Sequence, residues 1–212
     1  MMSTRIPDRH LQPRKLPTQP RSEATVEAIL QAAAHVFERH GYAAGTTNRI
    51  AERAGLSIGT LYQYFPNKDA ILVALAHRHL AEGTAALQPH FERLSAGARF
   101  DDVLPGVVDA MVSLHAIAPG LHRVLFEETK LPQTLRAELD ALEGQLVELA
   151  AHALAVDPDT GPPDPRLAAR IIVNVIEGLT HRLVLRPPPD VTADALAREI
   201  TQLVRAYTRI TH

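Results

Sequence analysis

Apolar side chains recur along this chain at three- and four-residue spacing, the pattern that places them on one face of an α-helix. The clearest stripe lies in the segment 22–40. It consists of Val26, Ile29, Leu30, Ala33 and Phe37. Ser22 is suited to cap the N-terminus of this segment and Gly41 to end it. The pattern therefore predicts a first helix from about Ser22 to His40.

Two short helices are predicted next. The second begins at Thr46 or Thr47, either of which is suited to cap it, and runs to about Ala54. Ser57 caps a third helix that reaches Phe65, because the proline that follows interrupts the pattern. The segment between these two helices holds a glycine, which suits a tight turn.

Further helices are predicted to the end of the chain. Asn67 is suited to cap a fourth helix, with Asp69 in its first turn. Asp164 followed by Pro165 marks another helix start. Proline and glycine separate the later segments. Their approximate bounds are 101–117, 120–129, 132–155, 165–185 and 192–209.

Composition supports an all-α fold of about nine helices. Aromatic residues, which favour strands, make up only 4% of the chain, so strands are disfavoured. The chain has no cysteine, which fits a reducing cytoplasm and excludes thiolate chemistry. No stretch reaches the roughly 18 apolar residues of a membrane span. The N-terminus lacks the apolar core of a secretory signal. We therefore expect a cytoplasmic protein.

Charge is distributed unevenly along the chain. Residues 1–70 carry nine Lys/Arg and six Asp/Glu, a net of +3, whereas the remainder carries thirteen against eighteen, a net of −5. A basic first third suits contact with phosphate. Residues 1–21 hold four prolines and five basic residues against one acid, so we interpret them as a flexible basic arm. The arm either contacts DNA or has no role.

The segment 46–72 has the pattern of two helices joined by a tight turn, TTNRIAERAGLSIGTLYQYFPNKDAIL. Ala51 and Gly55 supply small residues where the two backbones approach each other. The glycine can take the positive φ that the turn requires. Apolar residues of the segment are spaced to pack on the first helix. The third helix is left with an outward face of hydroxyls, an amide and phenols, which suit base edges and phosphates in a major groove.

This segment resembles the DNA-binding domain of the TetR family of transcriptional regulators. The matching residues are Ala54-Gly55-Leu56-Ser57, then Gly59-Thr60-Leu61-Tyr62, Tyr64-Phe65 and Lys68-Asp69. The resemblance is strong over about 22–75, and beyond that it covers only helical layout and length. It implies that the basic arm over 1–21 is followed by a three-helix helix-turn-helix domain over 22–67 and a helical ligand-binding and dimerisation domain over 68–212.

The resemblance also implies roles for individual residues in binding DNA. The positions that match phosphate contacts are Thr46, Thr47, Tyr62 and Lys68. Those that match base-facing positions are Ile58, Gly59, Thr60, Gln63 and Tyr64. Ile58 can offer a base only an apolar contact, such as that with a thymine methyl. In this interpretation the protein is a repressor that binds a palindromic operator on double-stranded DNA.

A palindromic operator requires a homodimer with two recognition helices about one DNA turn apart. The last two predicted helices are the best candidates for the interface, as they are in the family. Apolar residues form one face of each: Leu167, Ile171, Val175 and Leu179 on the first, Leu196, Ile200, Leu203 and Tyr207 on the second. The alternative is that these faces serve only the core of one chain.

The resemblance further implies a pocket in the C-terminal half for a small-molecule effector that releases the DNA. Polar and aromatic residues on otherwise apolar helices are candidates to line it: His115, His122, Phe126, Glu127, Asn174, Glu177 and His181. For each of them the alternative is a polar group with a local structural partner. The chemistry of the effector does not follow from the resemblance.

Neither catalysis nor a cofactor is expected. The residues show no spacing typical of a nucleophile and its base, and no glycine-rich phosphate loop. His77 and His79 lie two apart on a helix and therefore on different faces, so they cannot chelate one metal ion together. We expect no metal. The rival interpretation of the whole chain is a small-molecule-binding helical dimer without specific operator binding.

Overall fold

The computed structural model describes residues 20–129 and 132–209. The secondary-structure elements of this part of the chain are all helices, which confirms the all-α fold. One isolated β-bridge joins Thr160 and Arg209. The helices form two compact units. Of the described residues, unit 1 comprises those up to Leu80 together with those in Ala118–Arg136, and unit 2 comprises Ala81–Ile117 with those from Ala137 onward. The predicted N-terminal arm lies almost wholly outside the described residues.

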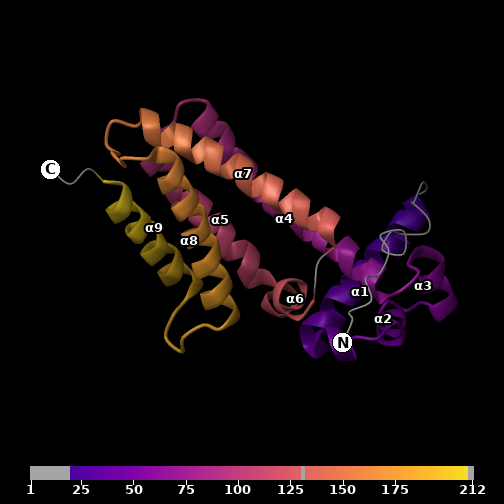
Figure 1. Cartoon of the computed structure of the whole chain (residues 1–212). Helices are drawn as coiled ribbons and strands as arrows, with labels where there is room; N and C mark the ends of the chain where they lie inside the picture. The colour runs from indigo at the N-terminus through magenta and orange to yellow at the C-terminus, as the bar shows by residue number, and fades with distance from the viewer. Residues whose placement is uncertain (1–19, 130–131, 210–212) are drawn as a thin grey trace, which may run out of the picture. The chain divides into compact units, whose positions relative to one another are not determined.

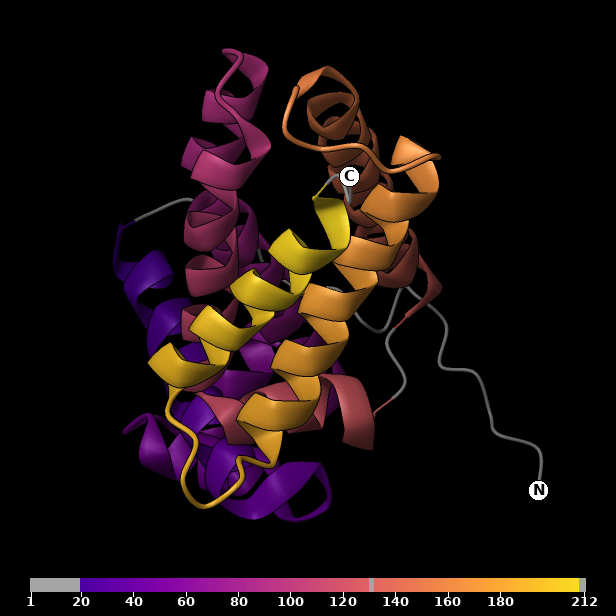
Figure 2. The ribbon, with the colours of Figure 1, turned by 90° about the vertical axis from the view of Figure 1, so that its left-hand side faces the viewer.

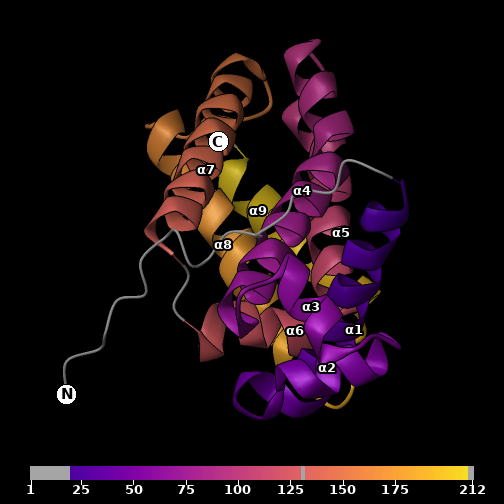
Figure 3. The same cartoon turned by 90° about the vertical axis from the view of Figure 1, so that its right-hand side faces the viewer.

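Unit 1 contains the three N-terminal helices, the first turns of the fourth helix and elements from later in the chain (Figures 1 and 3). Its elements are α1 (Pro20–Ala44), α2 (Thr47–Arg53), α3 (Ile58–Tyr64), the first turns of α4 (Lys68–Ser95), α6 (Pro119–Arg123) and the π-helix η2 (Val124–Glu128). The predicted helix over 120–129 is thus divided between α6 and η2.

The core of unit 1 is formed by the apolar stripe of α1 and the inward faces of the short helices. Phe37, Leu61 and Phe65 are fully buried in it. Leu121 and Leu125, from α6 and η2, belong to the same cluster. This packing places residues 118–136 with the N-terminal helices, whereas the sequence set the domain boundary between residues 67 and 68. The apolar pattern cannot show which later segment packs on α1.

Helix α1 changes direction at Gly41, where the predicted stop lies. Gly41 has φ 69° and ψ 175°, outside the helical region, and a short turn to Ala44 follows it. A Cβ at this position would lie 3.0 Å from a carboxylate oxygen of Glu128, so both the backbone angle and the space favour glycine. The first helix begins at Pro20 and not at Ser22, since proline is tolerated in a first helical turn.

Side-chain caps hold the starts of several helices as the sequence indicated. Thr46 and Ser57 each accept a hydrogen bond from the backbone N–H three residues ahead, at 3.3 and 3.0 Å. Asn67 accepts from the N–H of Ala70 at 2.8 Å. Asp164 accepts two such bonds at the start of α8. Each cap satisfies a donor that the first helical turn leaves without a partner.

Unit 2 is built from the rest of α4, α5 (Phe100–Ile117), α7 (Gln133–Val156) beyond its first turn, α8 (Pro165–Leu185) and α9 (Ala193–Thr208). Helices α5, α8 and α9 contact one another pairwise. Figure 2 shows α8 and α9 side by side, with no other helix of unit 2 in front of them. The core of the unit includes Val108, Val112, Ile172 and Ile200.

Polar contacts fix one end of unit 2. The buried carboxylate of Asp157 accepts a hydrogen bond from the backbone N–H of Phe100 at 3.0 Å, which satisfies the start of α5. Arg205 on α9 donates from Nε to Asp101 at 2.6 Å. These bonds tie the beginning of α5 to the end of α9 and to the loop after α7. In the described residues no single helix is long and apolar enough to cross a membrane, although α5 and the helical segment after it pass that test as a bent pair.

Candidate nucleic-acid interface

The turn between α2 and α3 has the geometry of a helix-turn-helix. Gly55 adopts φ +67°, and an added Cβ there would meet no atom within 4 Å, so only the backbone angle calls for glycine. The N–H of Leu56 donates to the carbonyl of Ala51 at 2.9 Å and closes the end of α2. Ile50 and Leu61, one on each helix, are fully buried. The turn therefore directs the apolar side of α3 into the core of unit 1.

The opposite side of α3 is exposed. Ile58, Gly59, Tyr62 and Gln63 are its exposed residues, and Tyr62 keeps 40% of its surface accessible. These positions follow one another at helical spacing and form one stripe. We call this stripe the α3 face. It offers an amide, a phenol, an apolar side chain and a bare backbone position.

Two residues expected to face bases are less accessible. The Thr60 hydroxyl lies 2.8 Å from that of Ser57, so it takes part in the cap of α3. Tyr64 is half-buried and packs against the core of unit 1. The sequence did not separate these positions from the α3 face, because a seven-residue helix shows too few turns to define its buried side.

Two of the residues expected to contact phosphate are hydrogen-bonded to each other. The Thr47 hydroxyl on α2 lies 3.1 Å from the Tyr62 hydroxyl on α3. Neighbouring Thr46 uses its own hydroxyl to cap α2. The Thr47–Tyr62 bond joins the two helices on the exposed side of the motif, so both hydroxyls are held in place before any ligand arrives.

Lys68 is engaged within unit 1. Its ammonium donates to the carbonyl of Tyr42 at 2.8 Å and lies 3.9 Å from the centre of the Tyr42 ring. The Tyr42 hydroxyl donates to Asp69. Burial, reinforced by this bond and by the negative charge of Asp69, raises the pKa of the Tyr42 phenol. An ammonium has three donors, so Lys68 retains capacity for a further acceptor.

A carboxylate from η2 contacts the end of α1. Glu128 accepts from the backbone N–H of Tyr42 at 2.9 Å and pairs with Arg123 at 3.2 Å. These contacts connect η2 to the kink at Gly41, directly before the helix-turn-helix. Nothing in the apolar pattern marks Glu128 for this position.

The residues expected to line an effector pocket occur in both units. In unit 1, the buried ring of His122 stacks on Phe126, with ring centres 4.4 Å apart, and lies edge-on to His79 at 4.8 Å. Glu127 is exposed. His79 was not a candidate from the sequence, where it was considered only beside His77. Its position on α4 becomes informative only when α6 is placed against that helix.

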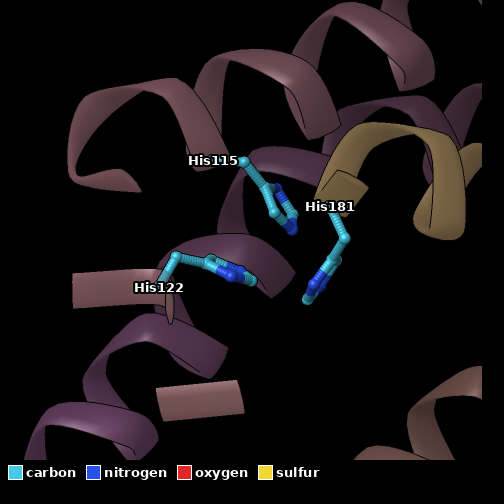
Figure 4. Close-up of side chains that lie close together, drawn as sticks. All are labelled: His115, His122 and His181. Atoms are coloured by element: carbon cyan, nitrogen blue, oxygen red, sulfur yellow. The ribbon is translucent and has the colours of Figure 1, made fainter. Parts of the chain in front are cut away.

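In unit 2, two of the expected residues come together. The rings of His115 on α5 and His181 on α8 lie edge-on with centres 4.7 Å apart (Figure 4). His115 is buried, and burial lowers the pKa of its imidazole. Asn174 and Glu177 on α8 are exposed. Asn174 donates to Glu143 on α7 at 3.2 Å.

Comparison with known proteins agrees with this architecture. Residues 29–75 match the N-terminal domain model described as bacterial regulatory proteins, tetR family. Residues 100–207, about half of the chain, match the model described as tetracyclin repressor-like, C-terminal domain. The chain belongs to the TetR family. The resemblance found in the motif between Thr46 and Leu72 thus extends to the C-terminal half, where the sequence indicated only helical layout.

Individual relatives of this TetR-family chain are distant. The nucleoid occlusion factor SlmA of Mannheimia succiniciproducens is 33% identical over 149 residues. That match spans 66% of this chain and 66% of the relative, slightly less than two thirds of its length. A TetR-like transcriptional regulator from Rhodococcus sp. RHA1 superposes with a TM-score of 0.67 at 24% identity, covering 90% of this chain and 96% of that one.

A second solved structure is AibR in complex with isovaleryl coenzyme A and operator DNA. It superposes with a TM-score of 0.65 at 20% identity and covers 84% of this chain and 97% of that one. At these identities the superpositions establish that the TetR fold is shared. The residues that contact DNA or an effector in this chain have to be argued from its own geometry.

The residues expected at the dimer interface divide into two groups. Leu167 and Ile171 on α8 and Leu203 and Tyr207 on α9 are exposed. Leu196 and Ile200 are instead buried in the core of unit 2, and Val175 and Leu179 are half-buried. A TetR-family dimer through these helices would therefore use the outer part of the predicted faces. The sequence pattern did not separate the exposed residues of α8 and α9 from the buried ones, because both groups are apolar.

Proposed function

We propose that this TetR-family protein is a transcriptional repressor that binds a palindromic operator as a homodimer and is released by a small-molecule effector. The observation that carries the proposal is the α3 face, with Tyr62 tied to Thr47 across the turn at 3.1 Å. The exposed side of this short helix thus combines hydrogen-bonding groups with one apolar side chain, the types of group that contact phosphates and base edges in a major groove.

The α3 face supports reading of bases as well as binding of phosphate. Gln63 is exposed, and a glutamine amide can bond an adenine edge through two hydrogen bonds. Ile58 offers an apolar contact for a thymine methyl. Gly59 lets the helix backbone come close to the groove, since it has no side chain. Tyr62 and Thr47 suit backbone phosphates, which fix the position of the helix without reading sequence.

The exposed apolar residues of α8 and α9 support a homodimer. Leu167 and Leu203 keep 54% and 51% of their surfaces accessible, and Ile171 and Tyr207 lie a turn further along the two helices. Four large apolar side chains on two adjacent helices form a patch that a second copy of this chain would bury. Pairing of two such helical hairpins gives a four-helix interface.

The release step is proposed by analogy with relatives. AibR was solved in complex with isovaleryl coenzyme A and operator DNA, so a protein with this fold binds both a small molecule and DNA. An effector releases DNA only if it prefers a conformation in which the recognition helices are wrongly spaced. A preference of about 2 to 3 kcal/mol would weaken DNA binding roughly 30- to 150-fold. No enzymatic activity is proposed for this chain.

Fluorescence anisotropy tests the proposal. The full chain is titrated into labelled duplexes from the region upstream of its own gene, and into scrambled duplexes of the same composition, at several salt concentrations. Specific binding that falls steeply with salt is expected. Tyr62→Phe should weaken binding to both kinds of duplex, because it removes a phosphate-binding hydroxyl. Gln63→Ala should reduce discrimination at one base pair by about 1 to 3 kcal/mol.

Gln31→Ala is the matched control for Gln63→Ala. Both amides are exposed residues of unit 1, but Gln31 lies on α1 and donates to Glu27 one turn away. This variant should bind DNA like the parent. Equal affinity for all duplexes would favour the rival function, a helical dimer that binds small molecules without reading an operator. An unchanged base preference in Gln63→Ala would reject our assignment of the α3 face.

A further inference from the structure

Two histidines far apart in the sequence meet inside unit 2. His115 lies near the end of α5, and His181 lies on α8 (Figure 4). Their candidate ligand nitrogens are no more than 4.8 Å apart. Two imidazole nitrogens bound to one tetrahedral zinc ion are about 3.4 Å apart, given bonds of about 2.0 to 2.1 Å. A small rotation of the half-buried His181 ring would close this gap.

One ring nitrogen of His115 is hydrogen-bonded to a backbone carbonyl, as is common for histidines that bind a metal ion through the other nitrogen. Its Nδ1 lies 2.7 Å from the carbonyl oxygen of Met111, one turn earlier on α5. A carbonyl oxygen can only accept a hydrogen bond, so Nδ1 carries the proton and donates. In the neutral ring Nε2 then holds the lone pair. A backbone carbonyl on the second nitrogen fixes the tautomer and the direction of a ligand ring in this way.

The two rings of the pair differ in burial. His115 keeps only 3% of its surface accessible. His181 is half-buried, so the pair is not wholly enclosed. Figure 4 shows the far edge of the His115 ring turned toward His181. Figure 4 also labels His122, which lies on α6 of unit 1.

We propose that His115 and His181 bind a divalent transition-metal ion, with water or a small anion completing its coordination. Imidazole nitrogen suits zinc, nickel, cobalt and copper, whereas magnesium and calcium require oxygen ligands. The proposal concerns metal binding by unit 2 itself and does not depend on the operator function above.

Direct titration of the chelator-treated full chain with Co²⁺ or Zn²⁺ tests the site. Cobalt reports ligation by its visible absorption, and competition with a chromophoric chelator measures affinity. One tightly bound ion per chain is expected. His181→Ala should weaken it by at least the about 10- to 100-fold that loss of an outer-shell partner costs. His181 is the half-buried member of the pair, so its truncation should leave the fold intact, which circular dichroism checks.

The control variant is His152→Ala, which removes an exposed histidine of α7 in the same unit. It should bind cobalt like the parent. His115→Gln, which keeps a side chain of similar length in the buried position, should lose the tight ion as His181→Ala does. The proposal is overturned if the parent holds no ion more tightly than the His115→Gln/His181→Ala double variant. It is also overturned if His181→Ala and His152→Ala bind equally well.

Discussion

A methyl group added at Gly178 tests whether two copies of this chain pair through α8. Gly178 is exposed, and an ideal Cβ there would meet no atom within 4 Å. It follows Leu167, Ile171 and Asn174 at spacings of four, three and four, so it shares their exposed side of the helix. A small residue on such a face lets two helices approach closely. We expect Gly178 to lie in the interface.

The expected magnitude follows from comparison with a second helical glycine. Gly144 on α7 is also exposed and also has nothing within 4 Å of an added Cβ. In each helix, alanine should be favoured over glycine by about 0.5 to 1 kcal/mol. Gly144→Ala should show only this gain. At Gly178 a two-fold dimer would receive two extra methyl groups, and overpacking of a close contact costs about 1 to 3 kcal/mol each.

Sedimentation velocity over a range of concentrations and thermal unfolding separate the two effects. Gly144→Ala should leave the dimer dissociation constant unchanged and raise Tm by a few degrees. Gly178→Ala should raise the dissociation constant by about tenfold or more, because each 1.4 kcal/mol corresponds to a factor of ten. If Gly178→Ala dimerises as well as the parent and gains the same Tm as Gly144→Ala, the α8 side containing Gly178 is not the interface.

Two other changes test the interior and the charges of unit 2. Thr180 is fully buried on α8, and within the described residues its hydroxyl has no hydrogen-bond partner, so Thr180→Val should stabilise the fold by about 1 to 3 kcal/mol in urea unfolding. The matched Thr201→Val should instead lose about 1 kcal/mol, because the Thr201 hydroxyl donates to Ala197 at 2.8 Å; a loss in both variants would contradict the reasoning. Glu177 is exposed as a residue, yet desolvation of its carboxyl, and then the charge of Glu143, raise its pKa above 4.5. Ionised Glu177 therefore opposes folding above that raised pKa, so Glu177→Gln should be more stable than the parent at neutral pH and lose the advantage as the pH falls into acid, whereas an advantage independent of pH would exclude this cause.

The α3 face shows how much of the candidate site in unit 1 could be predicted from the sequence. Spacing alone predicted α3, its Ser57 cap and the turn at Gly55, because caps and positive φ depend on residues next to each other in the chain. The same local rules did not separate exposed Gln63 from half-buried Tyr64. Which side of a seven-residue helix is buried depends on the core supplied by α1 and α4. The sequence likewise indicated only a phosphate contact for Lys68, and the fold brings its ammonium to Tyr42.

What the sequence by itself determined was the all-α fold, the approximate bounds of most helices, several of their caps, and the motif that indicated the TetR family. Those features arise from contacts within a few residues, so neighbouring side chains suffice to specify them. Only the tertiary structure decided that residues 118–136 join unit 1 and that Leu196 and Ile200 belong to the core. It also brought His115 to His181. The physical reason is that apolar burial has no direction and depends on total packing, which no local pattern contains.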